Sequence, residues 1–287
     1  MATQLRFKAK LARRWLRRLG QSVRYHRLSL QGAPLLFANS FPKSGTHLLT
    51  QVLQGFPRFT PTVNSGMPAI VTFQGDTGGA RSTDEIIHDL QMLLPGDIAY
   101  GHLHASPEVV AYLCQPGVAA YFILRDPRDV VISHVHYVTE MEPDHIHHRY
   151  YSQELRTFDE RLRTSILGIP DPAIPFPDIY QRFLPYLGWI DHPEVLTLRY
   201  EDFLTNRAEA LGQVYDHAVL RGLPAQASRE EAIQGLEASI DPGRSPTFRS
   251  GKAGGWRTQF SPENKLLFKD LAGDLLIQLG YEHDHDW

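Results

Sequence analysis

A lysine, two hydroxyl side chains and a glycine stand where a strand pattern changes to a helix pattern. The apolar run 35–38 predicts a short buried strand, and the spacing of residues 47–53 predicts a helix. The first N–H groups of a helix have no intrahelical partner, and they favour an anion. The side chains that would add a positive charge and hydroxyl donors there are Lys43, Ser44 and Thr46, around Gly45. We therefore expect an anion site. It is not a Walker A loop, because the lysine precedes the only glycine.

A second basic side chain follows the most apolar segment of the chain. Residues 118–124 form a near-continuous apolar run, as expected of a central parallel strand, and Arg125 comes directly after it. Ligands of open α/β sheets bind at the carboxyl ends of the strands, and a guanidinium suits a bidentate phosphate contact. An Asp-Pro-Arg-Asp turn and a helix pattern follow. Ser133 lies two turns into that helix, so it could face the same phosphate.

A third segment of similar character lies near the C-terminus. Residues 248–260 are rich in glycine, basic and typical of a loop. Such a loop can wrap an anion with its backbone N–H groups and an arginine. The residues that we expect at the anion are Arg249, Ser250 and Gly251.

Two histidines end another predicted strand, over residues 98–104. An imidazole titrates near neutral pH, so it is suited to removing a proton from a reacting hydroxyl group. His102 and His104 would share one face if the strand continued that far. Either histidine could therefore be a general base, and we favour His102.

Taken in order, these segments resemble the sulfotransferases that use 3′-phosphoadenosine 5′-phosphosulfate (PAPS). The Pro42–Thr46 loop is similar to the family's 5′-phosphosulfate loop. The strand that ends in Arg125, with Ser133, is similar to its 3′-phosphate motif. Residues 249–257 are similar to its C-terminal Arg-Lys-Gly-x-x-Gly-Asp-Trp-Lys loop, and residues 100–104 to its Lys-Thr-His-Leu-Pro strand end. The motifs keep the family's order over most of the chain, as in a bacterial-like member of the cytosolic type.

The resemblance implies direct, in-line transfer of a sulfuryl group from PAPS to a hydroxyl group, without a metal. It places Lys43 on the leaving oxygen and His102 on the acceptor proton. It implies that PAPS is held by Lys43, Ser44, Gly45, Thr46, His47, Leu48, Arg125, Ser133, Tyr200, Arg249, Ser250 and Gly251. It also places Tyr137 at the edge of the acceptor pocket. We expect His104, which stands where the family has a proline, to bind the acceptor as well.

Several positions depart from the family pattern. Ser250 and Gly255 replace a lysine and an aspartate of the C-terminal loop. Leu48 stands in the place of a stacking tryptophan, and residues 238–240 read Ala-Ser-Ile where Thr-Ser-Phe is common. We therefore expect aliphatic side chains around the adenine, with burial of apolar surface but without aromatic stacking.

Two other functions remain open. A P-loop nucleotide kinase or NTPase would need a Walker A loop and an acidic Mg²⁺ ligand at a strand end, where this sequence has Arg125. A nucleotide-binding protein without catalytic activity would keep the anion sites and lack turnover.

The elements that must position these residues alternate between strand and helix patterns. This alternation predicts a single α/β domain with a parallel central sheet flanked by helices and a P-loop-like nucleotide site. We expect a basic amphipathic helix within residues 1–30 and a sulfotransferase domain over residues 31–287. The histidine- and proline-rich segment 137–190 would be an acceptor-binding or lid insertion. It would shape a pocket for a small-molecule, lipid or glycan acceptor, and its aromatic residues and prolines favour an apolar or ring-containing one.

Composition limits the partners and the location. Net charge is −3, so total charge does not indicate nucleic-acid binding. The single cysteine, Cys114, and the lack of a membrane-spanning apolar run favour the cytoplasm. No Asp or Glu precedes Asp76, so the basic N-terminal helix could contact an anionic membrane. We favour instead a helix packed on the domain with its basic face in solvent. The oligomeric state is left open, because the family's C-terminal dimer motif is not preserved.

Overall fold

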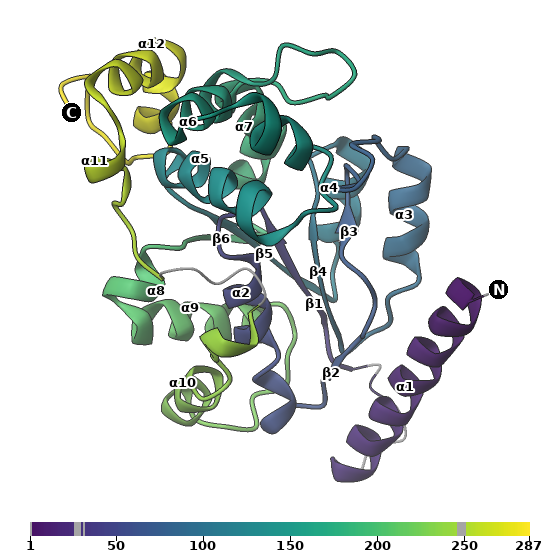
Figure 1. Cartoon of the computed structure of the whole chain (residues 1–287). Coiled ribbons are helices and arrows are strands. Elements are labelled where there is room, and N and C mark those ends of the chain that lie inside the picture. Colours follow the sequence, from purple (N-terminus) through teal and green to yellow (C-terminus); the bar gives the residue numbers. More distant parts are fainter. Residues whose placement is uncertain (1, 26–29, 31, 246–250) are drawn as a thin grey trace.

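A parallel β-sheet forms the centre of the molecule (Figure 1). The computed structural model describes the chain except residues 1, 26–29, 31 and 246–250, and the side chains of residues 2–11. Strand order is β2-β4-β1-β5-β6, β3 also pairs with β4, and all of these pairs are parallel. The strands are β1 (Leu35–Ser40), β2 (Val63–Asn64), β3 (Ile70–Val71), β4 (Asp97–His102), β5 (Val118–Leu124) and β6 (Val195–Arg199).

The predicted fold class is confirmed, and the strand patterns described above correspond to β1, β4 and β5. The sequence did not indicate β2 and β3. Each of them has two residues, too few to show an alternating pattern. They form because the edge strand β4 offers unpaired backbone groups. Gly101 permits the approach of β3, since a Cβ there would lie 2.1 Å from the Ile70 carbonyl oxygen.

Helices cover both faces of the sheet and bury two apolar clusters (Figure 1). One cluster holds the apolar sides of α3 (Thr83–Gln91), α4 (Pro107–Leu113), α5 (Pro127–His136), α6 (Phe158–Leu167), α7 (Ile179–Leu187), α11 (Trp256–Gln259) and α12 (Pro262–Gln278). The other holds those of α2 (Thr46–Leu53), α8 (Asp202–Thr205), α9 (Arg207–Leu220) and α10 (Arg229–Glu237). Thus α2 and α5, which follow the neighbouring strands β1 and β5, lie on opposite faces of the sheet.

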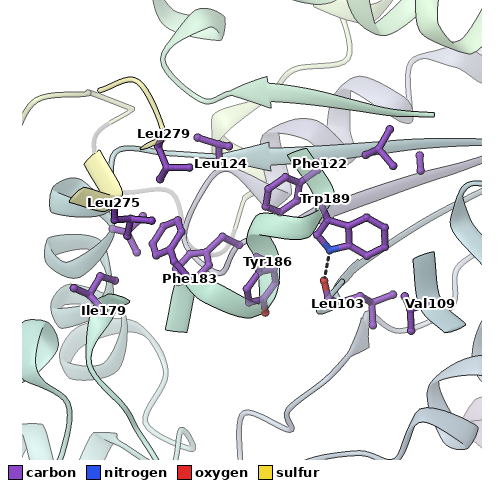
Figure 2. Close-up of a cluster of buried hydrophobic side chains, with 14 of the residues drawn as sticks. Leu103, Val109, Phe122, Leu124, Ile179, Phe183, Tyr186, Trp189, Leu275 and Leu279 are labelled. Atoms are coloured by element: carbon purple, nitrogen blue, oxygen red, sulfur yellow. Dashed lines mark hydrogen bonds between the residues drawn. The ribbon is translucent and has the colours of Figure 1, made fainter. Parts of the chain in front are cut away.

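The segment 137–190 packs over the first of these clusters. Its helix α7 ends at Leu187 and continues as a 3₁₀ turn, Gly188–Asp191. Pro185 inside α7 is tolerated, and its carbonyl accepts from the Ala105 N–H group at 2.7 Å. Figure 2 shows Trp189 of this turn donating to the Leu103 carbonyl at 2.7 Å. The end of this segment is therefore fastened to the residues that follow β4.

The N-terminal helix α1 (Ala2–Arg24) lies against the edge of the sheet near β2 (Figure 1). Its orientation differs from the sequence expectation. The arginines Arg14 and Arg18 are buried on Asp97, whereas Leu16 and Leu19 are exposed. The packed face is the basic one because Asp97, fully buried, supplies a carboxylate that both guanidinium groups share. In the described residues, no helix is both long and apolar enough to cross a membrane.

Candidate functional site

The register of the sheet brings the predicted motifs together. Ser40 pairs with Ile123, so the loop after β1 and Arg125 after β5 leave neighbouring strand ends. Asn39 pairs with Gly101, which places His102 beside Ser40. The Tyr200 N–H group donates to the Leu124 carbonyl at 2.9 Å. Because α2 and α5 depart to opposite faces, the ends of β1 and β5 form the crevice where ligands bind in open α/β sheets.

The loop between β1 and α2 has two residues with left-handed backbone conformation. Lys43 has φ 69°, the only positive φ of a non-glycine residue in the described part of the chain, and Gly45 has φ 103°. A Cβ at Gly45 would lie 2.7 Å from the Tyr200 ring. A glycine is therefore required at position 45 for two reasons. The backbone has a left-handed φ, and the Tyr200 ring leaves no room for a Cβ atom. A strained lysine of this kind is typical of a functional loop.

The Lys43 ammonium lies 3.6 Å from the centre of the Tyr137 ring. Within the described residues it forms no ion pair with a carboxylate. Burial first, and Arg125 second, lower the pKa of Lys43 to about 7, although Glu142 opposes the shift. An anion bound beside Lys43 would restore the charge of the ammonium.

Two buried polar atoms near this loop have no partner among the described residues, Ser44 Oγ and Arg125 Nε. Arg125 Nη2 donates to the Lys252 carbonyl at 2.9 Å and lies 3.4 Å from Asp129 Oδ2. Asp129 also accepts from the Gly254 and Trp256 N–H groups. Asp129 thus holds the C-terminal loop against Arg125. The Nε–H group of Arg125 takes no part in these contacts. Buried donors without partners are costly, so they indicate a missing acceptor.

His102 is oriented by β1. Its Nδ1 lies 3.1 Å from the Ser40 carbonyl oxygen and 3.1 Å from Ser40 Oγ, which in turn is 2.7 Å from Thr46 Oγ1. Donation from Nδ1 to the carbonyl leaves Nε2 as the acceptor nitrogen. Burial chiefly, with Lys43 and His47, lowers the pKa of His102 to about 4, while the Ser40 carbonyl opposes the shift. The ring is therefore neutral at pH 7, the form that can accept a proton.

His104 has different surroundings. Strand β4 ends at His102, so the shared strand face that would make the two histidines equivalent does not extend to His104. The His104 ring packs edge-on against Tyr186 and Phe73, at 4.8 Å and 5.4 Å between ring centres. Burial lowers the pKa of His104. The residue belongs to an aromatic wall.

One cavity of about 930 Å³ collects the predicted residues. It is lined by Lys43, Gly45, Thr46, His47, Leu48, His102, His104, Arg125, Ser133, Tyr137, Tyr200 and Gly251. Ser44 is fully buried behind this lining. Arg249 and Ser250 lie outside the described residues. No Asp or Glu lines the cavity among the residues that the structure describes, so its charged lining is basic.

Part of the cavity lining combines predicted side chains with two that the sequence did not single out. The predicted ones are Leu48 and Ile240, the aliphatic residues that we expected around an adenine. The other two are Phe203 and Arg207 of α8 and α9. Phe203 directly follows Tyr200-Glu201-Asp202. Its position next to a predicted nucleotide-binding tyrosine could have identified it as a cavity residue from the sequence. Trp256 does not line the cavity, because it is buried against Arg128 at 3.8 Å.

Another part of the lining carries a histidine cluster and an arginine. His134 Nε2 lies 3.2 Å from His147 Nδ1, and the rings of His145 and His147 are 4.6 Å apart. Burial chiefly lowers the pKa of His145 to about 4 and that of His147 to about 3. The Arg182 guanidinium lies 4.0 Å from the Phe176 ring and donates to the Ser165 carbonyl. These groups line the cavity together, so this wall is aromatic with a cationic member.

Ion ligands are grouped elsewhere. Among the described residues, one group of His, Cys, Asp or Glu side chains is close enough to share an ion: Cys114, His192 and Glu194. Cys114 precedes β5, and the other two precede β6. They therefore lie toward the amino ends of parallel strands, away from the cavity.

Comparison with known proteins identifies this architecture. The family model described as "Sulfotransferase domain" matches residues 120–280, more than half of the chain. No curated protein sequence gives a significant match. Mouse sulfotransferase SULT7A1, solved with PAP, is similar in structure with a TM-score of 0.58 and 17% identity, over 86% of this chain and 87% of the other.

Two structures of retinol dehydratase are also similar. The complex with androsterone and the inactive cofactor PAP has a TM-score of 0.57 and 17% identity, over 84% of this chain and 80% of the other. The complex with retinol and PAP has a TM-score of 0.58 and 16% identity, over 85% and 82%. At this identity the likeness shows the fold.

Proposed function

The chain belongs to the sulfotransferase family, and on this premise we propose that it transfers a sulfuryl group from PAPS to a hydroxyl group. One observation carries the proposal. Two cationic groups line the cavity at adjacent strand ends, Lys43 with its loop and Arg125, and His102 lines the same cavity. We infer that each of the two cations marks an anion site. An enzyme for a simple 5′-nucleotide would not need the second site, whereas a 3′,5′-substituted nucleotide does.

The residues present fit such a nucleotide. Among the described residues, Ser44 Oγ and Arg125 Nε are buried donors that find no acceptor, and no side chain caps the N-terminus of α2. We assign Ser44, Gly45, Thr46 and His47 to the 5′ side, and Arg125, Ser133 and the loop that contains Gly251 to the 3′-phosphate. Leu48, Tyr200 and Phe203 would enclose the nucleoside. PAPS, when bound, supplies the activated sulfuryl group.

His102 is our candidate for the general base. Its Nδ1 is held by the Ser40 carbonyl, so Nε2 would receive the proton of the acceptor hydroxyl group. The low pKa keeps the ring neutral, and a bound anion would offset the repulsion from Lys43 and raise that pKa. His104 has a place in the wall against Tyr186 and Phe73, and we assign it to acceptor contact.

Lys43 would stabilise the negative charge that develops on the leaving oxygen. Its strained backbone angle and its contact with Tyr137 hold the ammonium in one position. A preorganised charge of this kind acts without reorganisation during the reaction. The transfer depends on positioning and on charge, as phosphoryl transfer does.

The acceptor would be a hydroxyl compound with an apolar, ring-containing body. Phe73, Tyr186 and Phe176 line the cavity beyond His102 and offer flat apolar surfaces. Two structures similar to this chain contain androsterone and retinol, which supports an acceptor of this class. A lipid or glycan acceptor would present the same hydroxyl chemistry.

The proposal is tested by turnover and by ligand binding. The protein should convert PAPS and a mixture of phenols, alcohols and glycans to sulfated product, and His102→Ala should lose turnover but keep nucleotide binding. Unchanged turnover in His102→Ala would remove the base assignment. For the rival kinase or NTPase, the discriminating result is thermal stabilisation by Mg-ATP and none by adenosine 3′,5′-bisphosphate. Nucleotide binding without turnover on any acceptor would favour the inactive binding protein.

A further inference from the structure

The N-terminal helix α1 is amphipathic in an unusual orientation. Over residues 12–24, whose side chains the structure describes, its polar face is packed and its apolar face is in solvent. In soluble proteins the apolar stripe of a surface helix normally faces the core. This reversal concerns a part of the molecule separate from the cavity, so it carries an inference independent of the proposed reaction.

The polar face is fastened by specific contacts, which fix the orientation of the helix. Arg14 and Arg18 both pair with the buried Asp97, Arg18 Nη1 at 2.9 Å. Arg14 also donates to the Met92 carbonyl at 3.0 Å, and Arg18 to the Pro95 carbonyl at 2.8 Å. One turn further on, Gln21 donates to the Pro57 carbonyl at 3.0 Å. Arg14, Arg18 and Asp97 are buried, so rotation of the helix would leave buried charges unpaired.

The opposite face presents large apolar side chains to solvent. Trp15 is 60% exposed, Leu16 68%, Leu19 63% and Val23 67%. Leu19 follows Trp15 by four residues and Leu16 by three, and Val23 follows Leu19 by four, so all four lie on one side of the helix. Four such side chains in one stripe form a contiguous apolar patch of the kind that marks an interaction surface.

The charge of the helix identifies what would cover this patch. Residues 2–24 contain no Asp or Glu and hold Arg6, Lys8, Lys10, Arg13, Arg14, Arg17, Arg18 and Arg24. Asp97 compensates only part of this charge. We propose that α1 lies on an anionic lipid surface, with Trp15, Leu16, Leu19 and Val23 inserted among the acyl chains. A helix with an apolar stripe and a cationic flank is the type that binds at the membrane interface, where tryptophan is also favoured.

A second copy of the chain fits this surface less well. Two α1 helices in contact would bring two strongly basic segments together without an acidic residue on either. The like charges of two helices in contact repel each other, whereas an anionic headgroup layer attracts the same basic residues. Charge complementarity therefore selects the lipid.

The test is flotation of the full chain with vesicles of phosphatidylcholine and phosphatidylglycerol in equal parts, and with vesicles of phosphatidylcholine alone. The variant Leu16→Ser/Leu19→Ser removes two exposed side chains, so it should not disturb the core. Leu220→Ser/Leu266→Ser is the matched control, because these leucines are 79% and 63% exposed on other helices. Circular dichroism and unfolding curves verify that all three proteins are folded.

We expect the native protein and the control to float with the anionic vesicles, less so as salt is added. Partitioning of the α1 variant should fall roughly 30-fold. Absence of native flotation, equal binding to phosphatidylcholine alone, or equal flotation of the α1 variant would overturn the proposal. So would a native dimer in sedimentation that the α1 variant alone dissociates. Nucleotide binding is measured on the same samples, so failure of this proposal is distinguishable from failure of the proposed reaction.

Discussion

Binding of adenosine 3′,5′-bisphosphate should be coupled to uptake of a proton by Lys43. In the free protein, burial and the nearby Arg125 lower the pKa of Lys43 to about 7. A bound phosphate group places negative charge beside the ammonium and raises that pKa. At a pH between the pKa of Lys43 in the free protein and its higher pKa in the complex, the free protein therefore binds fewer protons than the complex. Affinity should fall as pH rises above about 7, because the ammonium must then be protonated during binding.

The magnitude follows from the pKa. At pH 8, one unit above it, about nine-tenths of free Lys43 is neutral, so binding should take up about 0.9 proton. At pH 6 the uptake by Lys43 should be about 0.1. The phosphates of the ligand are almost fully ionised at pH 8, since the second pKa of a phosphate monoester is about 6. His102, with its pKa near 4, stays neutral there before binding.

Titration calorimetry at pH 8 in buffers of different ionisation enthalpy measures this uptake. Lys43→Arg is the matched variant, because a guanidinium keeps its charge at every working pH and should remove the uptake while retaining an attractive charge. An observed enthalpy independent of the buffer would refute the reasoning. Equal uptake in native protein and Lys43→Arg would show that another group takes the proton.

Three further predictions concern the site and the helix α1. Gly45→Ala should lower the free energy of unfolding by about 1–3 kcal/mol and weaken nucleotide binding, because Gly45 has a left-handed φ and lies close to the Tyr200 ring. Denaturant unfolding measures the stability and nucleotide titration the affinity. A variant with unchanged stability and affinity would contradict the structure. Asp97→Asn should lower the free energy of unfolding by about 3–5 kcal/mol, because Arg14 and Arg18 then lose their shared carboxylate. A loss below about 1 kcal/mol in denaturant unfolding would count against that pairing. With the nucleotide site saturated, 2-naphthoate should bind more tightly than 2-naphthamide, because Arg182 lines the cavity wall that we assign to the acceptor. In calorimetry Arg182→Gln should abolish this preference, while Arg163→Gln, at an exposed arginine, should not. Equal binding of the two probes would exclude an anion contact at Arg182.

The sequence predicted the residues of the cavity better than the elements around it. Lys43, Arg125 and His102 follow or end strands that are apolar and long enough to be recognised, and parallel pairing then places their ends at one edge of the sheet. The strands β2 and β3 were missed because two residues carry no periodic signal. Their formation depends on the free edge of β4, which is a tertiary property.

Helix α1 shows a different limit of sequence reasoning. Its amphipathic pattern was visible, but the pattern does not state which face is packed. The usual preference for buried apolar side chains was overridden by Asp97, a carboxylate far away in the sequence that pairs with Arg14 and Arg18. The same applies to Arg182 and the histidines near it, which gather only because α5, α7 and the intervening segment fold over one cavity.

The central claim is a nucleotide site with separate places for a 5′ and a 3′ anion. The most direct measurement is the ratio of dissociation constants for adenosine 5′-monophosphate and adenosine 3′,5′-bisphosphate, in native protein and in Arg125→Gln. We expect the bisphosphate to bind about 10- to 100-fold more tightly to the native protein, and we expect Arg125→Gln to reduce this ratio toward one. Equal affinities in the native protein, or a ratio unchanged by Arg125→Gln, would contradict the account.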